Sequence, residues 1–177
     1  MIETARLLLR QWRSDDRPAF ATLCRSPAVM ACLGGPISAE QADAALDRAR
    51  TSHDAHGFGF WAMECRADGA LLGFCGLNVI TSALPVAGEV EIGWRLHENV
   101  WGLGYAREAA LATLRWGWRE TKLARVIAMT VPGNRRSWGL MERIGMVRRP
   151  ECDFGHPLFP DTHPLHRHIV YAIARPL

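Results

Sequence analysis

Residues 91–118 of the sequence, EIGWRLHENVWGLGYAREAALATLRWGW, decide the expected fold. Apolar and polar residues alternate over 88–96, which predicts a half-buried strand. Gly102 and Gly104 follow, one residue apart, and then a broad apolar face at helical spacing predicts a helix over 105–120. The stretch is therefore expected to form a strand, a glycine loop and a helix in direct succession.

The next segment, 124–131, is β-branched and mostly apolar, as expected of a buried strand. Two strands joined through a helix should lie parallel, with a right-handed crossover. Elsewhere, Ser14 is expected to cap an early helix. Ser38 with Gln41 has the pattern of a capping box. Further strands are expected at 6–12, 58–65, 71–80 and around 147 and 166–174.

This order predicts an α/β layered fold, a mainly antiparallel twisted sheet of about seven strands flanked by about four helices. The length favours a single domain over residues 1–177. The apolar fraction of 49% suffices for a core, and no apolar run is long enough to cross a membrane. The N-terminus lacks a signal-peptide pattern, so a cytoplasmic protein is expected.

The charge pattern gives little support to nucleic-acid binding. The net charge of +3 is mild and the arginines are scattered, without a basic run. Five cysteines without a C-x-x-C pair argue against a disulfide framework and a thiolate zinc site. The composition suits an anionic small ligand at least as well as a nucleic acid.

A glycine loop that opens a helix can bind an anion. The first helical N–H groups have no partner within the helix, the helix dipole adds positive charge, and absent Cβ atoms allow close approach. A simple tight turn would use the same glycines. A dinucleotide fingerprint needs a third glycine after Gly104, and a P-loop needs G-K-[ST], and both are absent.

At this point the chain resembles the GNAT acetyltransferases, and among them the group that acetylates the N-termini of ribosomal proteins. Similarity covers nearly the whole chain. It is carried by five stretches in the family's order: TARLLLRQW, GALLGFCGLNVI, the segment 91–118, VPGNRRSWGLMERIGM and HPLHRHIVYAI. Trp101 stands where the general family has Gln or Arg, as is usual in the ribosomal-protein subgroup.

The resemblance implies binding of acetyl-CoA and transfer of its acetyl group to an amine, with no metal. The backbone amides of the glycine loop would hold the pyrophosphate, the end of the strand would pair with the pantetheine arm, and Asn134 would contact that arm. Asn134 could equally be an N-cap. The implied cofactor-binding residues are Trp94, Arg95, Leu96, Trp101, Gly102, Leu103, Gly104, Tyr105, Ala106, Arg107 and Asn134.

Acetyl transfer to an amine needs a proton acceptor and a donor for the leaving thiolate. The acceptor is needed because amines are largely protonated at about pH 7. Glu91 is the candidate base, with Glu89 or a histidine as the alternative. Ser137 matches a subgroup serine proposed as thiol donor or contact. Many relatives carry a tyrosine acid where this chain has Met141, which cannot donate a proton.

The tail from 151 to 168 carries four histidines in a proline-rich loop. No set of carboxylates completes a metal site there. The resemblance implies instead that this loop edges the acceptor pocket, with Asp153 and His156 as substrate-binding candidates. Surface histidines on a rigid loop are the plainer interpretation.

Three functions stay open. The first is an acetyl-CoA-dependent N-acetyltransferase that works by direct transfer in a ternary complex. The second is a non-catalytic acyl-CoA-binding or regulatory module on the same fold, which the methionine at 141 favours. The third, an arginine-rich nucleic-acid binder, is disfavoured. The acceptor (a protein N-terminus or a small amine) and the oligomeric state are not identified by the sequence.

Overall fold

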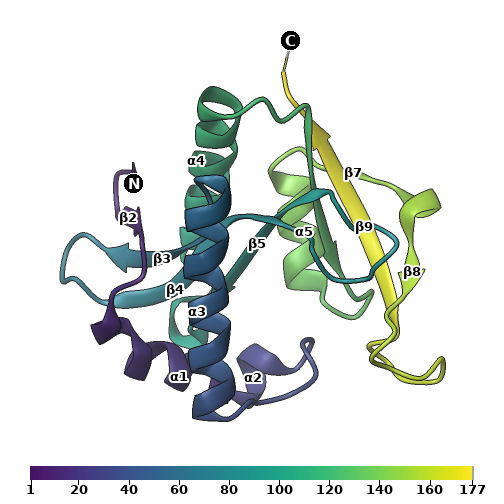
Figure 1. Ribbon diagram of the computed structural model, residues 1–177, viewed down its shortest axis with the longest axis horizontal. Coiled ribbons are helices and arrows are strands. Elements are labelled where there is room, and N and C mark those ends of the chain that lie inside the picture. Colours follow the sequence, from purple (N-terminus) through teal and green to yellow (C-terminus); the bar gives the residue numbers. More distant parts are fainter. Residues whose placement is uncertain (177) are drawn as a thin grey trace.

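The computed structural model describes residues 1–176 and contains one open sheet flanked by helices (Figure 1). Its strands are β1 (Ile2–Glu3), β2 (Leu7–Arg10), β3 (Phe60–Cys65), β4 (Leu71–Val79), β5 (Val90–Leu96), β6 (Arg125–Thr130), β7 (Val147–Arg148), β8 (Phe154–Gly155) and β9 (Arg167–Ala174). Its helices are α1 (Arg17–Arg25), α2 (Pro27–Met30), α3 (Ala39–His56), α4 (Tyr105–Glu120) and α5 (Arg135–Arg143).

The strand order is β1-β2-β3-β4-β5-β6-β9-β7, and β8 pairs with β9 outside this path. Neighbouring strands run antiparallel except β5 and β6, which are parallel as expected. The predicted fold class is thus confirmed. Two strands of two residues, β1 and β8, and the four-residue helix α2 are additional to the expected elements, because segments so short carry no periodicity in sequence.

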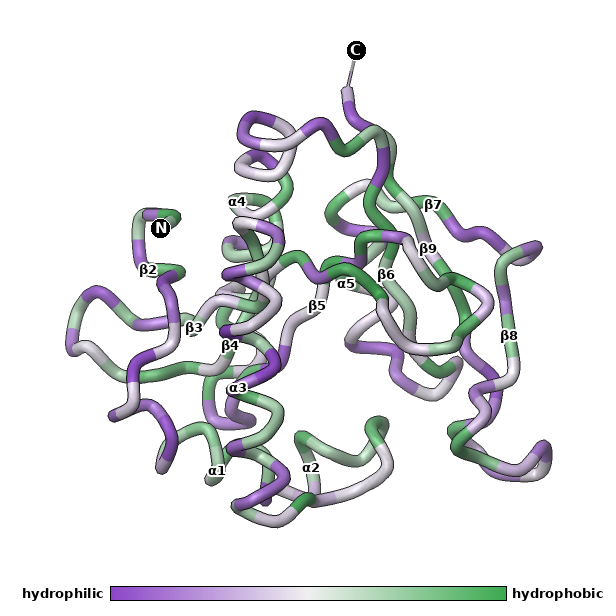
Figure 2. The backbone as a smooth tube through the Cα atoms, in the orientation of Figure 1, coloured by the Kyte–Doolittle hydropathy of each residue, from purple (hydrophilic) through white to green (hydrophobic). Residues whose placement is uncertain are grey.

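Helices cover both faces of the sheet. On one face, α4 packs its alanines and Leu114 against Val90, Ile92 and Leu96 of β5. The other face is covered by α1 and α3, which form a second core with Phe74 of β4. In Figure 2, much of α4 and of β4 is green, whereas α3 is mostly purple and pale. This agrees with the burial of α3, in which Ala42 and Leu46 are the buried residues.

Local signals explain several boundaries. The side chain of Ser38 accepts from the amide of Gln41 at 3.2 Å, and the amide of Ser38 donates to the Gln41 side chain at 2.9 Å, so the capping box is confirmed. Ser14 instead belongs to a short 3-10 helix (Ser14–Asp16) and does not cap α1. Gly145 follows α5 with φ of 89°, as expected of a C′ glycine.

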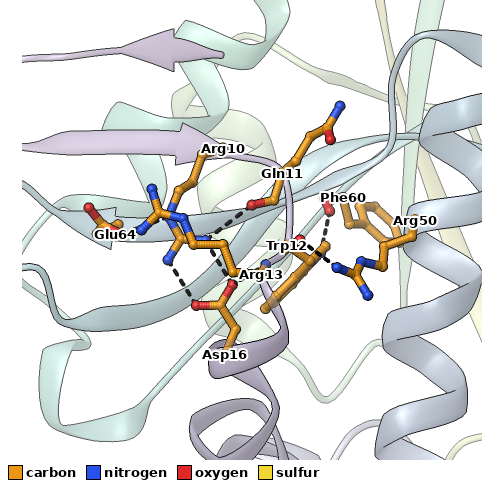
Figure 3. Close-up of polar contacts among 8 residues, drawn as sticks. All are labelled: Arg10, Gln11, Trp12, Arg13, Asp16, Arg50, Phe60 and Glu64. Carbon is orange, nitrogen blue, oxygen red and sulfur yellow. Dashed lines mark hydrogen bonds and ion pairs between the residues drawn. The ribbon is translucent and has the colours of Figure 1, made fainter.

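A buried ion network fixes the start of the chain on the helical layer (Figure 3). Nη1 and Nη2 of Arg10 donate to the two carboxylate oxygens of Asp16 at 2.7 and 2.8 Å, and its Nε donates to Glu64 at 2.6 Å. Arg10 is only 7% exposed. Burial favours the neutral form of Asp16, but its hydrogen bonds from Arg10 and Arg13 outweigh burial and lower its pKa.

Candidate functional site

The loop between β5 and α4 keeps its backbone bare. Gly102 and Gly104 have φ of 79° and 84°, in the left-handed region that side chains disfavour. A Cβ built on Gly102 would meet nothing within 4 Å, so the conformation, and not crowding, requires glycine there. Gly104 is the N-cap of α4. The loop therefore presents unpaired first-turn N–H groups beside an open surface, which is the geometry of an anion site.

Trp101 ties this loop to its surroundings. Its indole Nε1 donates to the backbone oxygen of Leu96, the last residue of β5, at 2.9 Å. The guanidinium carbon of Arg136, near the start of α5, lies 4.6 Å from the centroid of the Trp101 ring. The end of β5, the glycine loop and the beginning of α5 are thus held together by one side chain.

Arg6 brings a further positive charge to the loop. Its Nη1 donates to the backbone oxygen of Leu103 at 3.0 Å, and its Nε donates to Glu108 at 2.7 Å. Its guanidinium lies 4.3 Å from the centroid of the Tyr105 ring. Sequence reasoning missed Arg6, because nothing in its neighbourhood indicates a contact with residues about one hundred positions away.

One edge of β5 is free beyond its first residues. The strand pairs with β4 along its whole length, from Val90 to Leu96. On its other side, the pairing with β6 is confined to Glu91 opposite Ile127. Within residues 1–176, the later part of β5 therefore has backbone groups without a strand partner. The predicted pantetheine-pairing residues, Trp94, Arg95 and Leu96, lie on this part.

Side chains of β5 alternate between the two faces. Val90, Ile92 and Leu96 are buried against α4, as the sequence pattern predicted. Glu91 and Arg95 point to the opposite face, toward α3 and α1. The free edge of β5 therefore lies between two different faces of the sheet. One face is covered by α4, and the other carries the side chains of Glu91 and Arg95.

Glu91 is half-buried and has a single weak polar contact. Nδ2 of Asn78 lies 3.4 Å from its Oε1, and Oδ1 of Asn78 accepts from Ser52 of α3 at 3.0 Å. Burial raises the pKa of Glu91, which the contact with Asn78 opposes. A carboxylate in these surroundings is a stronger base than a solvated one.

Glu89, the alternative base, lies in a different setting. Its carboxylate forms an ion pair with Arg125, and the hydrogen bonds from that arginine lower its pKa. A carboxylate held by an arginine is a weaker proton acceptor. The surroundings thus shift the pKa values of the two acidic residues in opposite directions, up for Glu91 and down for Glu89.

The start of α5 carries the next two candidates. Oδ1 of Asn134 accepts from the amide of Ser137 at 3.3 Å, and its Nδ2 donates to Thr130 at 3.0 Å. Asn134 is therefore an N-cap, a role compatible with a ligand contact. The hydroxyl of Ser137 makes no side-chain hydrogen bond in the part of the chain that the structure describes. Met141 is 1% exposed and packs in the core.

The acceptor candidates of the tail have structural partners. The carboxylate of Asp153 binds Arg148 and Arg167 and accepts from the amide of Val170 at 3.2 Å. Burial favours the neutral form of Asp153, but these hydrogen bonds outweigh it and lower its pKa. This carboxylate is therefore a poor base, and its contact with an acceptor stays a prediction.

His156 lies in an aromatic cluster. Its ring centroid is 4.9 Å from that of His168 and 5.5 Å from that of Phe159. Burial, followed by the charge of His166, lowers the pKa of His156. Despite the four histidines of this region, residues 1–176 contain no group of three or more side chains that could hold a metal ion.

A membrane-spanning helix must be both long and apolar. Across residues 1–176, none of the helices combines the length and the apolar character needed to cross a bilayer.

Comparisons with known proteins agree on one family. A family model described as an acetyltransferase (GNAT) domain matches residues 6–147. The uncharacterized protein YkkB of Bacillus subtilis is 31% identical over 81% of this chain and 83% of its own length. The crystal structure of an acetyltransferase from Agrobacterium tumefaciens superposes with a TM-score of 0.80 at 29% identity, over 97% of this chain and 92% of that one.

More distant structures share the fold. A ribosomal alpha-N-protein acetyltransferase in complex with coenzyme A has a TM-score of 0.77 at 18% identity, over 97% of this chain and 95% of that one. A spermidine N-acetyltransferase from Vibrio cholerae, in complex with coenzyme A and spermine, has a TM-score of 0.75 at 16% identity, over 97% of both chains. The ribosomal-protein subgroup is thus one of several neighbours.

Proposed function

Because the chain belongs to the GNAT acetyltransferase family, whose members use acetyl-CoA, we propose that it is an N-acetyltransferase. It acts by direct transfer to an amine in a ternary complex, without a covalent enzyme intermediate, and residues 1–177 form one catalytic domain. The observation that carries the proposal is the left-handed loop of Gly102 and Gly104 beside the later part of β5, whose edge beyond Glu91 has no strand partner within residues 1–176.

On the donor side, the bound acetyl-CoA supplies an activated acetyl thioester. The amides of residues 102–107 hold its pyrophosphate at the N-terminus of α4, where the helix dipole favours negative charge. The backbone of residues 94–96 pairs with the pantetheine arm, and Asn134 adds a contact from the start of α5. Arg6 and Arg136 support this assignment because both place guanidinium groups against the loop.

On the acceptor side, Glu91 takes the proton that the amine must lose before it can attack. α-Amines and lysine-type amines are mostly protonated near about pH 7, so a base with a raised pKa is required. Its burial and its position beside the free strand edge support this role. In the net reaction, a C–N bond forms, a C–S bond breaks, and the proton lost by the amine balances the one gained by the thiol.

Ser137 is the group assigned to the leaving thiolate. It lies in the first turn of α5, three residues after the N-cap Asn134, and its backbone amide rather than its hydroxyl donates the capping bond. Met141 cannot take this role. A water molecule is the alternative donor.

The acceptor is proposed as a protein N-terminus or a small amine. Among proteins of the same fold, one is named for ribosomal alpha-N-protein acetylation and another for spermidine. These names cover both kinds of acceptor. The loop that carries His156 is proposed to edge the acceptor pocket, with Asp153 supporting its shape.

Calorimetric titration with acetyl-CoA tests the donor site. We expect binding by the wild type and at least about tenfold weaker binding by Gly102→Ala, because a Cβ at positive φ strains the loop and obstructs the phosphate. Gly69→Ala is the matched control, since Gly69 also has a positive φ of 73° and open space, but lies in the β3–β4 turn. Failure of the wild type to bind millimolar acetyl-CoA would refute the proposal.

Thiol release across a panel of amines tests catalysis. Glu91→Gln should lower kcat by about 10²–10⁴-fold, the usual contribution of a general base, while acetyl-CoA still binds. Unchanged turnover would remove Glu91 from the mechanism. A non-catalytic acyl-CoA-binding module, which Met141 favours, would bind acetyl-CoA and release no thiol with any amine.

A further inference from the structure

We propose that Arg95 binds a carboxylate carried by the acceptor, so that the substrate is a peptide-like amine with an acidic group beyond its first residue. The inference rests on the proposed function, because it places the acceptor amine at Glu91. It goes further because it assigns a chemical class to the acceptor. It also gives a role to the side chain of Arg95, a residue of which the proposed function uses only the backbone.

Arg95 lies on the helix-covered face of β5, next to α1. Its guanidinium carbon is 5.3 Å from the centroid of the Phe74 ring, and its Nη1 lies 3.6 Å from the sulfur of Cys24. A thiol is a weak acceptor. No carboxylate pairs with Arg95 anywhere in residues 1–176, and its Nε is buried without a hydrogen-bond partner there.

This arrangement is costly for the fold. Burial lowers the pKa of Arg95, and the group nevertheless stays protonated because the ordinary value is so high. Buried charged groups in proteins are normally paired, and those that are not often belong to functional sites. A cation held this way is prepared for an anion that residues 1–176 do not provide.

The geometry of the guanidinium selects the kind of anion. Nη1 is occupied by Cys24, whereas Nε and Nη2 share the opposite edge and have no partner among the described residues. Two parallel N–H groups on one edge match the two oxygens of a carboxylate. Nη2 is the atom open to solvent, and the ligand must displace the atoms that now cover Nε to reach both.

Spacing along β5 distinguishes acceptors. Glu91 and Arg95 point to the same face and are four residues apart, which separates their Cα atoms by roughly 13 Å. The amine and carboxylate of a free α-amino acid are too close together to meet both side chains. Between them, Gly93 has no side chain, and the ring of Phe60 lies over it. A peptide that reaches both side chains must therefore be extended, and the Phe60 ring must shift to admit it or form an apolar contact with its middle.

Matched peptides test the proposal by thiol release. Each pair of C-terminally amidated tetrapeptides differs only by Asp or Asn, placed at the second, third or fourth position. We expect the Asp member of at least one pair to have a kcat/KM at least about tenfold higher in the wild type, which corresponds to 1.4 kcal/mol. The ratio of kcat/KM between the Asp and Asn peptides should fall to about one in Arg95→Met. It should stay below the wild-type value in Arg95→Lys, which keeps the charge but loses the two parallel N–H groups of the guanidinium.

A second measurement needs no turnover. In ¹⁵N-edited spectra, the Nε–H resonance of Arg95 is assigned by its loss in Arg95→Met. Titration with the N-acetylated Asp peptides, which mimic the product, should shift this resonance, while the Asn peptides leave it in place. The Nε–H of Arg10, whose acceptor is Glu64, serves as the internal control.

The outcomes separate the two proposals. An Asp-to-Asn ratio of one in the wild type, a ratio retained by Arg95→Met, or an Arg95 resonance unmoved by millimolar Asp peptide would each overturn the carboxylate site. Absence of acetyl-CoA binding would overturn the proposed function while leaving the resonance shift as an independent result. Thermal unfolding of each variant confirms that it is folded before either comparison is made.

Discussion

Arg10 and Arg95 stand at the two ends of one row across the sheet. The register pairs Arg10 with Ala62, Ala62 with Phe74, and Phe74 with Arg95, so both arginines lie on the face that α1 and α3 cover. Arg10 donates to two carboxylates, and Arg95 meets a thiol and an aromatic ring. The same group in the same layer thus has a complete set of partners at one end and an incomplete set at the other.

This difference separates structure from function. The ion network of Arg10 joins β2, β3 and the turn before α1, and each guanidinium nitrogen of Arg10 donates to a partner within the chain. Arg95 has no ion-pair partner among residues 1–176, and it lies on the strand that carries Glu91 and the free edge. Four measurements follow from this contrast, ordered by the size of the expected effect.

The largest effect is expected from Arg10→Met. The substitution removes the cation that binds both Asp16 and Glu64, although Arg13 stays 3.4 Å from Glu64. Removal of one partner from a buried pair costs about 3–5 kcal/mol. Urea unfolding measures this loss. A cost below about 1 kcal/mol would show that the network does not stabilise the fold.

Asp16→Asn tests the same network from the acidic side. The pKa of Asp16 is lowered in the fold, so its ionisation contributes stability above the unfolded-state value of about 3.9, and this is lost as the pH falls. We expect a cost of about 1–3 kcal/mol at neutral pH. Urea unfolding should also show a smaller loss of stability in acid than in the wild type, and an identical acid profile would contradict the assignment.

Glu91→Gln should reveal the opposite dependence of stability on pH. Burial raises the pKa of Glu91, so its contribution to stability is complete below the unfolded-state value of about 4.3 and is lost as the pH rises through the folded-state pKa. The variant should therefore be more stable than the wild type above that range, by up to about 1–2 kcal/mol. Thermal unfolding across pH measures the difference, and a gain confined to acid would exclude a raised pKa.

The smallest effect is expected from Arg95→Met. A hydrophobic side chain of similar length next to Phe74 and Cys24 replaces a cation that has no anionic partner among residues 1–176. Such exchanges are often neutral or stabilising. We expect a change below about 1 kcal/mol in urea unfolding. A loss comparable to that of Arg10→Met would mean that Arg95 is structural after all.

Much of the fold could be predicted because its signals are local. The glycine loop and the apolar face located α4 at 105–120, and the pair Ser38 and Gln41 located the start of α3. The prediction that Ser14 caps an α-helix was wrong, because Ser14 is the first residue of a 3-10 helix. Ser14 and the acidic residues after it also suit the start of an α-helix, so the sequence does not distinguish the two. The strands of two residues form only because a longer neighbour offers them an edge.

The site was predictable to a smaller extent. Alternation along β5 correctly put Glu91 on the face opposite Ile92, and the free strand edge lies where a cofactor arm was expected. The side chain of Arg95 could not be interpreted in the same way. Its significance lies in what it lacks, and that depends on Cys24 and Phe74, which reach it only through the packing of α1 and β4.

One contact on this face bears on protein engineering. A methyl group on Gly93 would come within 2.8 Å of the Phe60 ring, so the two positions share a single volume. A larger residue at 93 is compatible with the sheet only if residue 60 becomes smaller, and a smaller residue at 60 alone would open a hollow between Glu91 and Arg95. Libraries that aim to change the range of acceptors should therefore vary positions 60 and 93 together.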